Sequence, residues 1–148
     1  MKNIALLIDS SYELLKSELI KLDVKLDEVD LNSEIKTQNY DAFVIALEDN
    51  SDSKLKPLIQ QFHEDSSPIG AFKNSPRLVS EVLGDYGVAV TMGNDSSLAE
   101  QIEKSGAQFV ECEDDDFITD RQNKVVTSPV NVNEAGIQKA IAEIFEMA

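Results

Sequence analysis

The chain has 148 residues, the length of one ordinary domain, and can bury a core without disulfide or metal support. Its 13 basic and 28 acidic residues give a net charge of −15, which argues against nucleic acid and anionic membranes as partners, because both bind through lysine and arginine. The single cysteine excludes an internal disulfide, as suits a reducing cytoplasm.

Apolar runs and amphipathic stretches alternate from the start of the chain. Ile4–Ile8 is a continuous apolar run, typical of a strand buried on both faces, and it is too short for a signal peptide or a membrane span. Ser10 and Ser11 are predicted to cap a first helix. Val24–Leu31 alternates like an edge strand, and Ala42–Leu47 predicts a second buried strand.

The middle of the chain repeats this order. Ser51–Asp65 predicts a helix with Pro57 in its first turn, where proline is tolerated. Ile69–Phe72 predicts a third short strand. Pro76 then begins another helix, and Gly84 is predicted to close it.

The last third contains one more predicted central strand, Val88–Val90. Asp95–Ser97 is predicted to cap a helix, with Glu100 completing a capping box to Ser97. The segment 117–127 predicts a β-hairpin, and the final helix begins near Asn133.

This alternation predicts one α/β domain over residues 1–148. We expect a flavodoxin-like, doubly wound, mainly parallel sheet with an added β-hairpin near 117–127. Binding sites in such sheets lie at the carboxyl ends of the strands. Those ends carry Asp9, Leu47–Asp49, Lys73, Thr91–Asn94 and Cys112.

Several short segments of the second half carry a family resemblance: Pro68–Ala71, Thr91–Asp95, Ser105–Ala107, Val110–Cys112, Asp115–Asp116 and Asp120–Pro129. With these segments the chain resembles the ThiJ/PfpI, or class I glutamine amidotransferase-like, superfamily. The resemblance is to its ElbB-like branch, which is glyoxalase-like and linked to isoprenoid biosynthesis. Relative to that branch the chain is shortened, in loops around its first three strands.

The resemblance implies a nucleophile position that this chain has changed. The family pattern is proline-isoleucine-glycine-alanine-x-cysteine, with the cysteine in a sharp turn at a helix N-terminus that lowers its pKa. Here the pattern starts at Pro68 and places Lys73 where the cysteine belongs. Cys112 coincides with a second, additional cysteine of the family. We expect it to be structural and unreactive, because Glu111 and Glu113 lie beside it.

Two further features of the family site differ. The family has a glycine-rich turn after its third strand, whose N–H groups would stabilise an oxyanion. Here that turn carries Glu48 and Asp49 and no glycine. A family glutamate near the start of the first helix is matched by Glu13. The resemblance therefore implies a degenerate site of Glu13, Lys73 and Asn74, with no catalytic residue, no cofactor and no metal.

Three other readings of polar residues stay open. Lys73 at a helix N-terminus would favour the neutral amine that Schiff-base chemistry uses, or it is a charged lysine paired with Glu13, or with Glu48 and Asp49. The acidic stretch 111–120 is a solvated loop or a calcium loop that lacks the EF-hand glycine and terminal glutamate. Acidic residues after the first and third strands also suit a receiver-like signalling domain, although Thr91 and Lys73 follow the wrong strands for one.

The function that we expect is non-catalytic. The chain would be a pseudoenzyme that binds or scaffolds through protein–protein interaction. A homodimer or a heteromeric partner is implied because members of the superfamily are commonly dimers. The alternative is a glyoxalase-like or amidase-like enzyme with a rebuilt active site.

Overall fold

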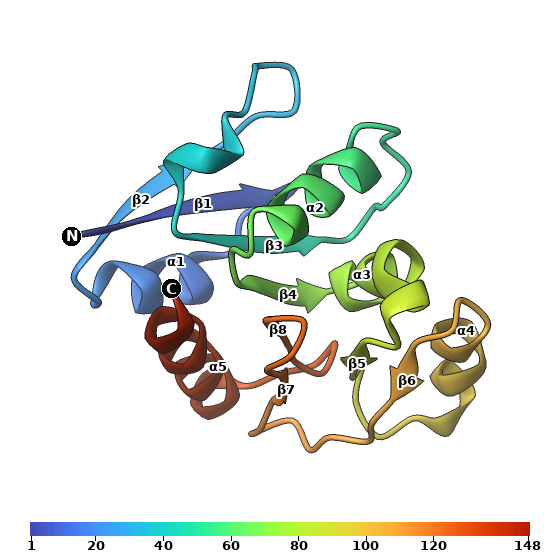
Figure 1. The fold of residues 1–148 in the computed structure, drawn as a ribbon. Coiled ribbons are helices and arrows are strands. Elements are labelled where there is room, and N and C mark those ends of the chain that lie inside the picture. The colour runs from blue at the N-terminus through green and yellow to red at the C-terminus, as the bar shows by residue number, and fades with distance from the viewer.

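A computed structural model describes residues 1–148. Its main sheet has six strands in the order β2-β1-β3-β4-β8-β7 (Figure 1). All neighbours are parallel except β7 and β8, which are antiparallel. The strands are β1 (Lys2–Ile8), β2 (Val24–Glu28), β3 (Ala42–Leu47), β4 (Ile69–Lys73), β7 (Ile118–Asp120) and β8 (Val125–Thr127). A separate parallel pair consists of β5 (Ala89–Val90) and β6 (Gln108–Phe109).

Helices cover both faces of this sheet. The α-helices are α1 (Glu13–Ile20), α2 (Leu55–Glu64), α3 (Ser75–Leu83), α4 (Ala99–Glu103) and α5 (Glu134–Met147). Short 3-10 turns occur at Thr37–Asn39, Gly84–Tyr86 and Ser96–Leu98. Buried side chains of α1 and α5 pack on one face, and those of α2, α3 and α4 pack on the other (Figure 1). The predicted flavodoxin-like, mainly parallel fold is therefore confirmed.

The centre of the sheet is fully apolar. Ile4–Leu7 of β1 and all of β3 are buried, because helices cover both of their faces. On the side of α2, the rings of Phe43 and Phe62 stack with their centres 4.4 Å apart. Each such side chain stabilises the fold by about 1.5–3 kcal/mol through burial. This core fixes the positions at which β1, β3 and β4 end.

The prediction for Val88–Val90 was wrong. Only Ala89 and Val90 form a strand, and it pairs with β6 outside the main sheet. The place beside β4 belongs to β8, with Ile69 opposite Val125. The hairpin 117–127, which was predicted as an addition to the sheet, is therefore an integral part of it.

Two predicted helix caps are also absent. Tyr12 occupies the N-cap position of α1 and makes no side-chain cap, so Ser10 and Ser11 do not have that role. The side chain of Asp95 caps the 3-10 turn through the N–H of Ser97, and α4 begins only afterwards, without a capping box. The predicted cap of α5 is confirmed, because Asn133 Oδ1 accepts a hydrogen bond from the N–H of Gly136 at 3.0 Å.

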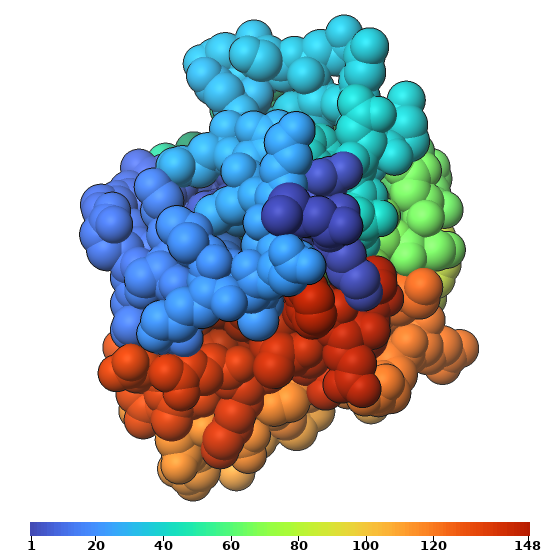
Figure 2. Space-filling model, turned by 90° about the vertical axis from the view of Figure 1, so that its left-hand side faces the viewer, coloured from blue at the N-terminus to red at the C-terminus, as the bar shows by residue number.

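The start of the first strand lies close to the end of the last helix, where the dark blue and red surfaces of Figure 2 meet. Lys2 Nζ donates hydrogen bonds to the backbone oxygens of Phe145, at 3.1 Å, and Ala148. None of the helices combines the length and apolar character needed to cross a membrane.

Candidate functional site

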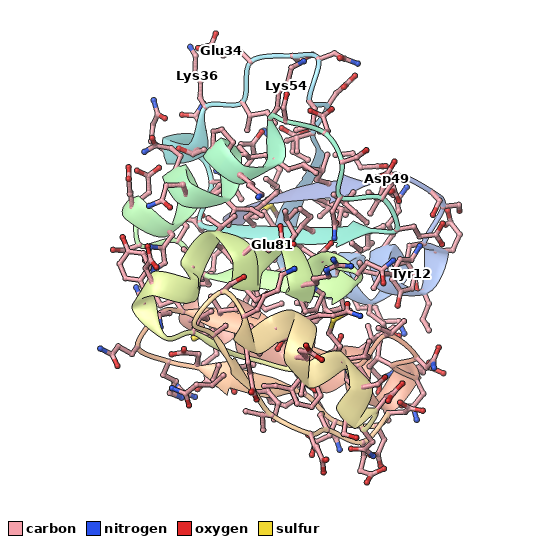
Figure 3. The ribbon with its side chains drawn as sticks, turned by 90° about the vertical axis from the view of Figure 1, so that its right-hand side faces the viewer. Tyr12, Glu34, Lys36, Asp49, Lys54 and Glu81 are labelled. Carbon is pink, nitrogen blue, oxygen red and sulfur yellow. The ribbon has the colours of Figure 1, made fainter.

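Polar residues gather where the central strands end. β1, β3 and β4 finish at Ile8, Leu47 and Lys73, and each is followed by polar residues. In Figure 3 the side chains of Tyr12 and Asp49 lie toward the same side of the molecule. This edge is where the fold places a binding site.

Lys73 has the backbone of a sharp elbow. Its φ is +58°, in the left-handed region that residues with a Cβ rarely adopt. The sequence placed it in the connecting turn, whereas it is the last residue of β4 and makes the turn itself. The N–H of Asn74 then donates to Leu47 O at 3.0 Å, and Asn74 Nδ2 donates to Glu48 O at 2.9 Å. These two bonds fasten the elbow to the end of β3.

Three neighbours hold the ammonium group of Lys73. Its Nζ donates to Ser10 Oγ at 3.1 Å and lies 3.6 Å from Glu48 Oε1. It also lies 4.6 Å from the centre of the Tyr12 ring. The Lys73 side chain is only 18% exposed. Because Glu48 is 66% exposed, the ion pair contributes no more than about 1 kcal/mol, a size that cation–π contacts also reach. The position of the Lys73 ammonium group is therefore set by several weak contacts together.

No hydrogen bond or ion pair joins Glu13 to the other two residues of the expected degenerate site, Lys73 and Asn74. Glu13 is exposed at the start of α1, and its Oε1 accepts a hydrogen bond from Ser11 Oγ at 3.2 Å. Among the three carboxylates proposed from the sequence, only Glu48 forms an ion pair with Lys73. Lys73 and Asn74 are adjacent at the elbow, so the site is built from β4 and the turn after β3.

The carboxylate of Asp9 accepts hydrogen bonds from the backbone amides of the turn after β3. Asp9 accepts hydrogen bonds from the N–H of Glu48, at 3.1 and 3.0 Å, and from the N–H of Asp49, at 2.9 Å. These are the N–H groups of the turn that the resemblance equates with oxyanion donors. Sequence reasoning missed this contact. The sequence feature that could have indicated it is that Asp9 directly follows β1, which is the neighbour of β3 in the sheet.

A cleft of about 680 Å³ opens on the other side of the elbow, and we call it the polar cleft. Its only cation is Arg77, and its three apolar residues are Met92, Leu98 and Val130. Its carboxylates are Glu48, Asp49, Glu81, Asp95 and Asp114, and its amide side chains are Asn50, Asn74, Asn94, Gln101 and Asn131. Lys73 does not line this cleft. The cleft is suited to polar ligands and was not found from the sequence, since its residues come from five separate segments of the chain.

Cys112 is buried. Its side chain is 6% exposed, and Sγ donates to the backbone oxygen of Glu113 at 3.4 Å. Burial raises the pKa of the Cys112 thiol to about 11, and the charges of Asp116 and Asp115 add to this effect. The sequence had named the acidic neighbours as the cause, and burial is the larger one.

Acidic residues do not converge into a metal site. No group of three or more His, Cys, Asp or Glu side chains is arranged to hold an ion. In the stretch 111–120, Asp116 accepts from the N–H of Phe117, and Asp120 accepts from the N–H groups of Ala89 and Asn123. At the ends of β1 and β3, Asp9 is bonded to backbone amides. Both groups of carboxylates therefore organise loops.

Comparison with known proteins gives the fold. No protein-family model matches the chain. An isoprenoid biosynthesis protein with an amidotransferase-like domain from Ehrlichia chaffeensis superposes with a TM-score of 0.79 at 20% identity, covering 99% of each chain. A ThiJ/PfpI domain protein from Brachyspira murdochii gives 0.67 at 11% identity, covering 99% of this chain and 97% of its own. Drosophila melanogaster DJ-1beta gives 0.63 at 15% identity, covering 100% and 96%. The chain therefore has the fold of the ThiJ/PfpI, DJ-1 and amidotransferase-like proteins.

Proposed function

We propose that this protein is a non-catalytic binding protein built on the ThiJ/PfpI fold. The observation that carries the proposal is Lys73, which stands at the elbow with its ammonium held by Ser10, Glu48 and Tyr12. In the resembling family the elbow presents a nucleophilic cysteine. A thiolate has a free electron pair with which to attack a carbonyl carbon, whereas an ammonium group has none.

The surroundings of the elbow support the same proposal. Tetrahedral intermediates of acyl transfer need N–H donors directed at the developing negative charge. The N–H groups of Glu48 and Asp49 are bonded to Asp9. Three carboxylates near the elbow would also repel an oxyanion. Loss of both the nucleophile and the free donors removes most of the rate enhancement that this chemistry requires.

The enzyme alternative has a distinct chemistry. A glyoxalase-like or amidase-like activity with a rebuilt site would have to use Lys73 as a neutral amine that forms a Schiff base. In the structure this amine is instead in contact with the carboxylate of Glu48, the hydroxyl of Ser10 and the ring of Tyr12. The receiver-like alternative is not supported, because Asp9 is engaged with backbone amides and no acidic group gathers there to hold magnesium.

Turnover measurements test the proposal. We expect wild-type protein to consume methylglyoxal, and to hydrolyse the amide of glutamine, no faster than the Lys73→Ala variant. Lys73→Cys should stay inactive as well, because Asp9 still occupies the amide donors. Turnover above that of Lys73→Ala would overturn the proposal.

Trapping with borohydride provides a second measurement. Reduction in the presence of methylglyoxal should not attach the carbonyl compound to Lys73, as peptide mapping would show. Lys124 is a matched control, because it also has a positive φ, of +56°, and its Nζ also donates to a neutral oxygen, Ser66 O, at 3.1 Å. Selective modification of Lys73 over Lys124 would support the Schiff-base alternative.

Assembly is the second part of the proposal. We propose a homodimer or a heteromeric protein partner, which follows from the resemblance to a superfamily with many dimers. Light scattering after size-exclusion chromatography gives the mass directly, and a dimer has twice the 16.4 kDa of one chain. A monomer that captures no partner from native extract would leave the polar cleft as the binding surface.

A further inference from the structure

Strand β2 forms an open edge of the main sheet, because it pairs only with β1. The N–H of Val29 donates to Leu6 O of β1 at 2.9 Å, and alternate residues of a strand point their backbone groups to the same side. The N–H and C=O groups of Leu26 and Glu28 therefore point away from β1, and no hydrogen bond within the chain engages them. Figure 2 looks onto this edge, where the light-blue surface around β2 lies at the front. The opposite edge is different, since β5 lies against β7.

The charges of this strand are complementary to themselves. In an antiparallel pair of two copies centred on Leu26, Lys25 of each copy stands opposite Asp27 of the other. Moving the centre by one residue would place Lys25 opposite Lys25, or Asp27 opposite Asp27. Both side chains are exposed, and Lys25 has no ion pair within the chain. Asp27 Oδ2 accepts a hydrogen bond from the hydroxyl of Tyr40, which leaves Oδ1 for a second cation.

The same arrangement pairs the free backbone groups. Leu26 of each copy exchanges both of its hydrogen bonds with Leu26 of the other, as residues in a hydrogen-bonded antiparallel pair do. The N–H of Glu28 then faces the carbonyl oxygen of Val24 in the second copy. The N–H of Val24 is already bonded to Leu22 O at 2.9 Å, so the ladder ends there. The register chosen by the charges is therefore one that the backbone can also satisfy.

Helix α1 presents an exposed apolar side chain on the side of this edge. Lys16 Nζ lies 2.9 Å from Glu28 Oε2 of β2, and Ile20 follows one turn later on the same side of the helix. The opposite side of α1 faces α5, because Gln138 Nε2 donates to Glu18 Oε1 at 3.4 Å. Ile20 is 65% exposed. A two-fold axis through the paired edges places the α1 helices of both copies on the same face of the sheet, where Ile20 gains an apolar neighbour.

We propose that β2 is a dimer interface, through which two copies of this chain join their sheets into one by antiparallel pairing centred on Leu26. The inference rests on the assembly part of the proposed function, for which it names the surface and the partner. Charged residues on an edge strand usually prevent pairing. Here Lys25 and Asp27 lie symmetrically about Leu26, so a second copy converts them into two ion pairs, as an interface between identical surfaces requires. The net charge of −15 opposes association at long range, but physiological salt screens exposed charges beyond about 8 Å.

Charge reversal tests this interface on the whole protein, by analytical ultracentrifugation over a concentration series. We expect the wild type to form a dimer of twice 16.4 kDa. Lys25→Asp and Asp27→Lys each place like charges opposite one another, so each should raise the dissociation constant by about tenfold or more. An equimolar mixture of the two variants should recover the dimer, because position 25 of each chain then faces the opposite charge at position 27 of the other. Both variants stay strongly acidic, so a general attraction between the chains would not explain the recovery.

A proline substitution tests the backbone pairing separately. Glu28→Pro removes an N–H that makes no bond within the chain, and edge strands tolerate proline at such positions. The matched control is Glu28→Ala, since both variants lose the ion pair with Lys16 and only the proline variant loses the N–H. We expect Glu28→Ala to dimerise as the wild type does and Glu28→Pro to dimerise about tenfold more weakly. Circular dichroism and urea unfolding verify that both variants are folded.

Each outcome separates the possibilities. A dimer that all four variants leave unchanged would overturn this inference alone, because the interface would then lie elsewhere. A mixture of Lys25→Asp and Asp27→Lys that stays monomeric, or equal weakening by Glu28→Pro and Glu28→Ala, would overturn it as well. So would a larger assembly, since two-fold pairing leaves no free β2 edge. A wild type that is monomeric throughout would overturn the inference together with the proposed homodimer, whereas turnover of methylglyoxal would refute only the non-catalytic function.

Discussion

At the scale of single residues, the backbone of Lys73 adopts an unfavourable conformation that its side chain does not require. A φ of +58° costs a residue with a Cβ about 1–2 kcal/mol. Sequence comparison with the family pattern located this position, because the pattern itself implies a sharp turn. What it could not supply was the set of contacts to Ser10 and Tyr12, which lie in the loop between β1 and α1, far from Lys73 in the sequence.

This conformation predicts an order of stability. Lys73→Gly and Lys73→Ala both lose the ammonium contacts, but only alanine keeps a Cβ at the positive φ. We expect the glycine variant to have the higher free energy of unfolding, by about 1 kcal/mol, in urea titrations. The same pair of substitutions at the exposed Gln61 of α2 is the control. There alanine should be the more stable by about 1 kcal/mol. Equal stability of the two variants at position 73 would contradict a strained elbow.

Cys112 predicts a pH dependence of stability. The pKa of its thiol is about 11 in the folded protein, against about 8.5 for a free cysteine. Between these values the folded chain keeps a proton that the unfolded chain has lost. The contribution of Cys112 to stability is therefore full below about pH 8.5 and is lost as the pH rises through 11.

The matched variant Cys112→Ala isolates this contribution. Other groups that titrate at alkaline pH affect both proteins alike, so the wild type should lose stability more steeply with pH than the variant in this window. The thiol should also react slowly with disulfide reagents at pH 7 in the folded state and rapidly in urea. Parallel stability curves, or a fast reaction of the folded protein, would refute the interpretation.

At the scale of elements, the end of α3 depends on the close approach of another loop. Gly84 is the C-cap of α3, as predicted, but its φ is −57° and a 3-10 turn continues to Tyr86. Gly87, with a φ of +65°, ends that turn. Glycine is needed at 84 for another reason: a Cβ there would lie 1.9 Å from the backbone oxygen of Ser105. The sequence pattern identified a glycine terminus without showing which glycine makes the turn.

Alanine substitutions separate these two roles. Gly84→Ala would push the backbone of Ser105 away from α3 and should lower the free energy of unfolding by about 2 kcal/mol or more. Gly87→Ala has open space, since the nearest atom would be Gln108 Nε2 at 3.9 Å, and should cost only about 1 kcal/mol from its positive φ. Urea denaturation of both variants measures the difference. A larger cost at Gly87 would show that backbone conformation, and not contact with Ser105, limits this region.

At the scale of the whole molecule, the sequence predicted the layers of the fold better than the neighbours within the sheet. Ile4–Ile8 and Ala42–Leu47 are long apolar runs, so their burial on two faces followed from composition. Val88–Val90 and Val125–Thr127 are equally short, and local pattern cannot decide which of them pairs with β4. That choice depends on contacts between distant parts of the chain. The hydrogen bonds that the turn after β3 donates to Asp9 could not be predicted for the same reason.

The pairing of β4 with β8 has a consequence for synthesis on the ribosome. The chain emerges from its N-terminus, so β1 to β4 are complete well before Val125–Thr127 exist. During that interval the edge of β4 displays unpaired backbone groups along the apolar Ile69–Phe72. Exposed apolar strand edges recruit strands of other chains. A pause in translation between α3 and β8 therefore lowers the yield of folded protein, whereas a pause after Thr127 finds that edge already covered.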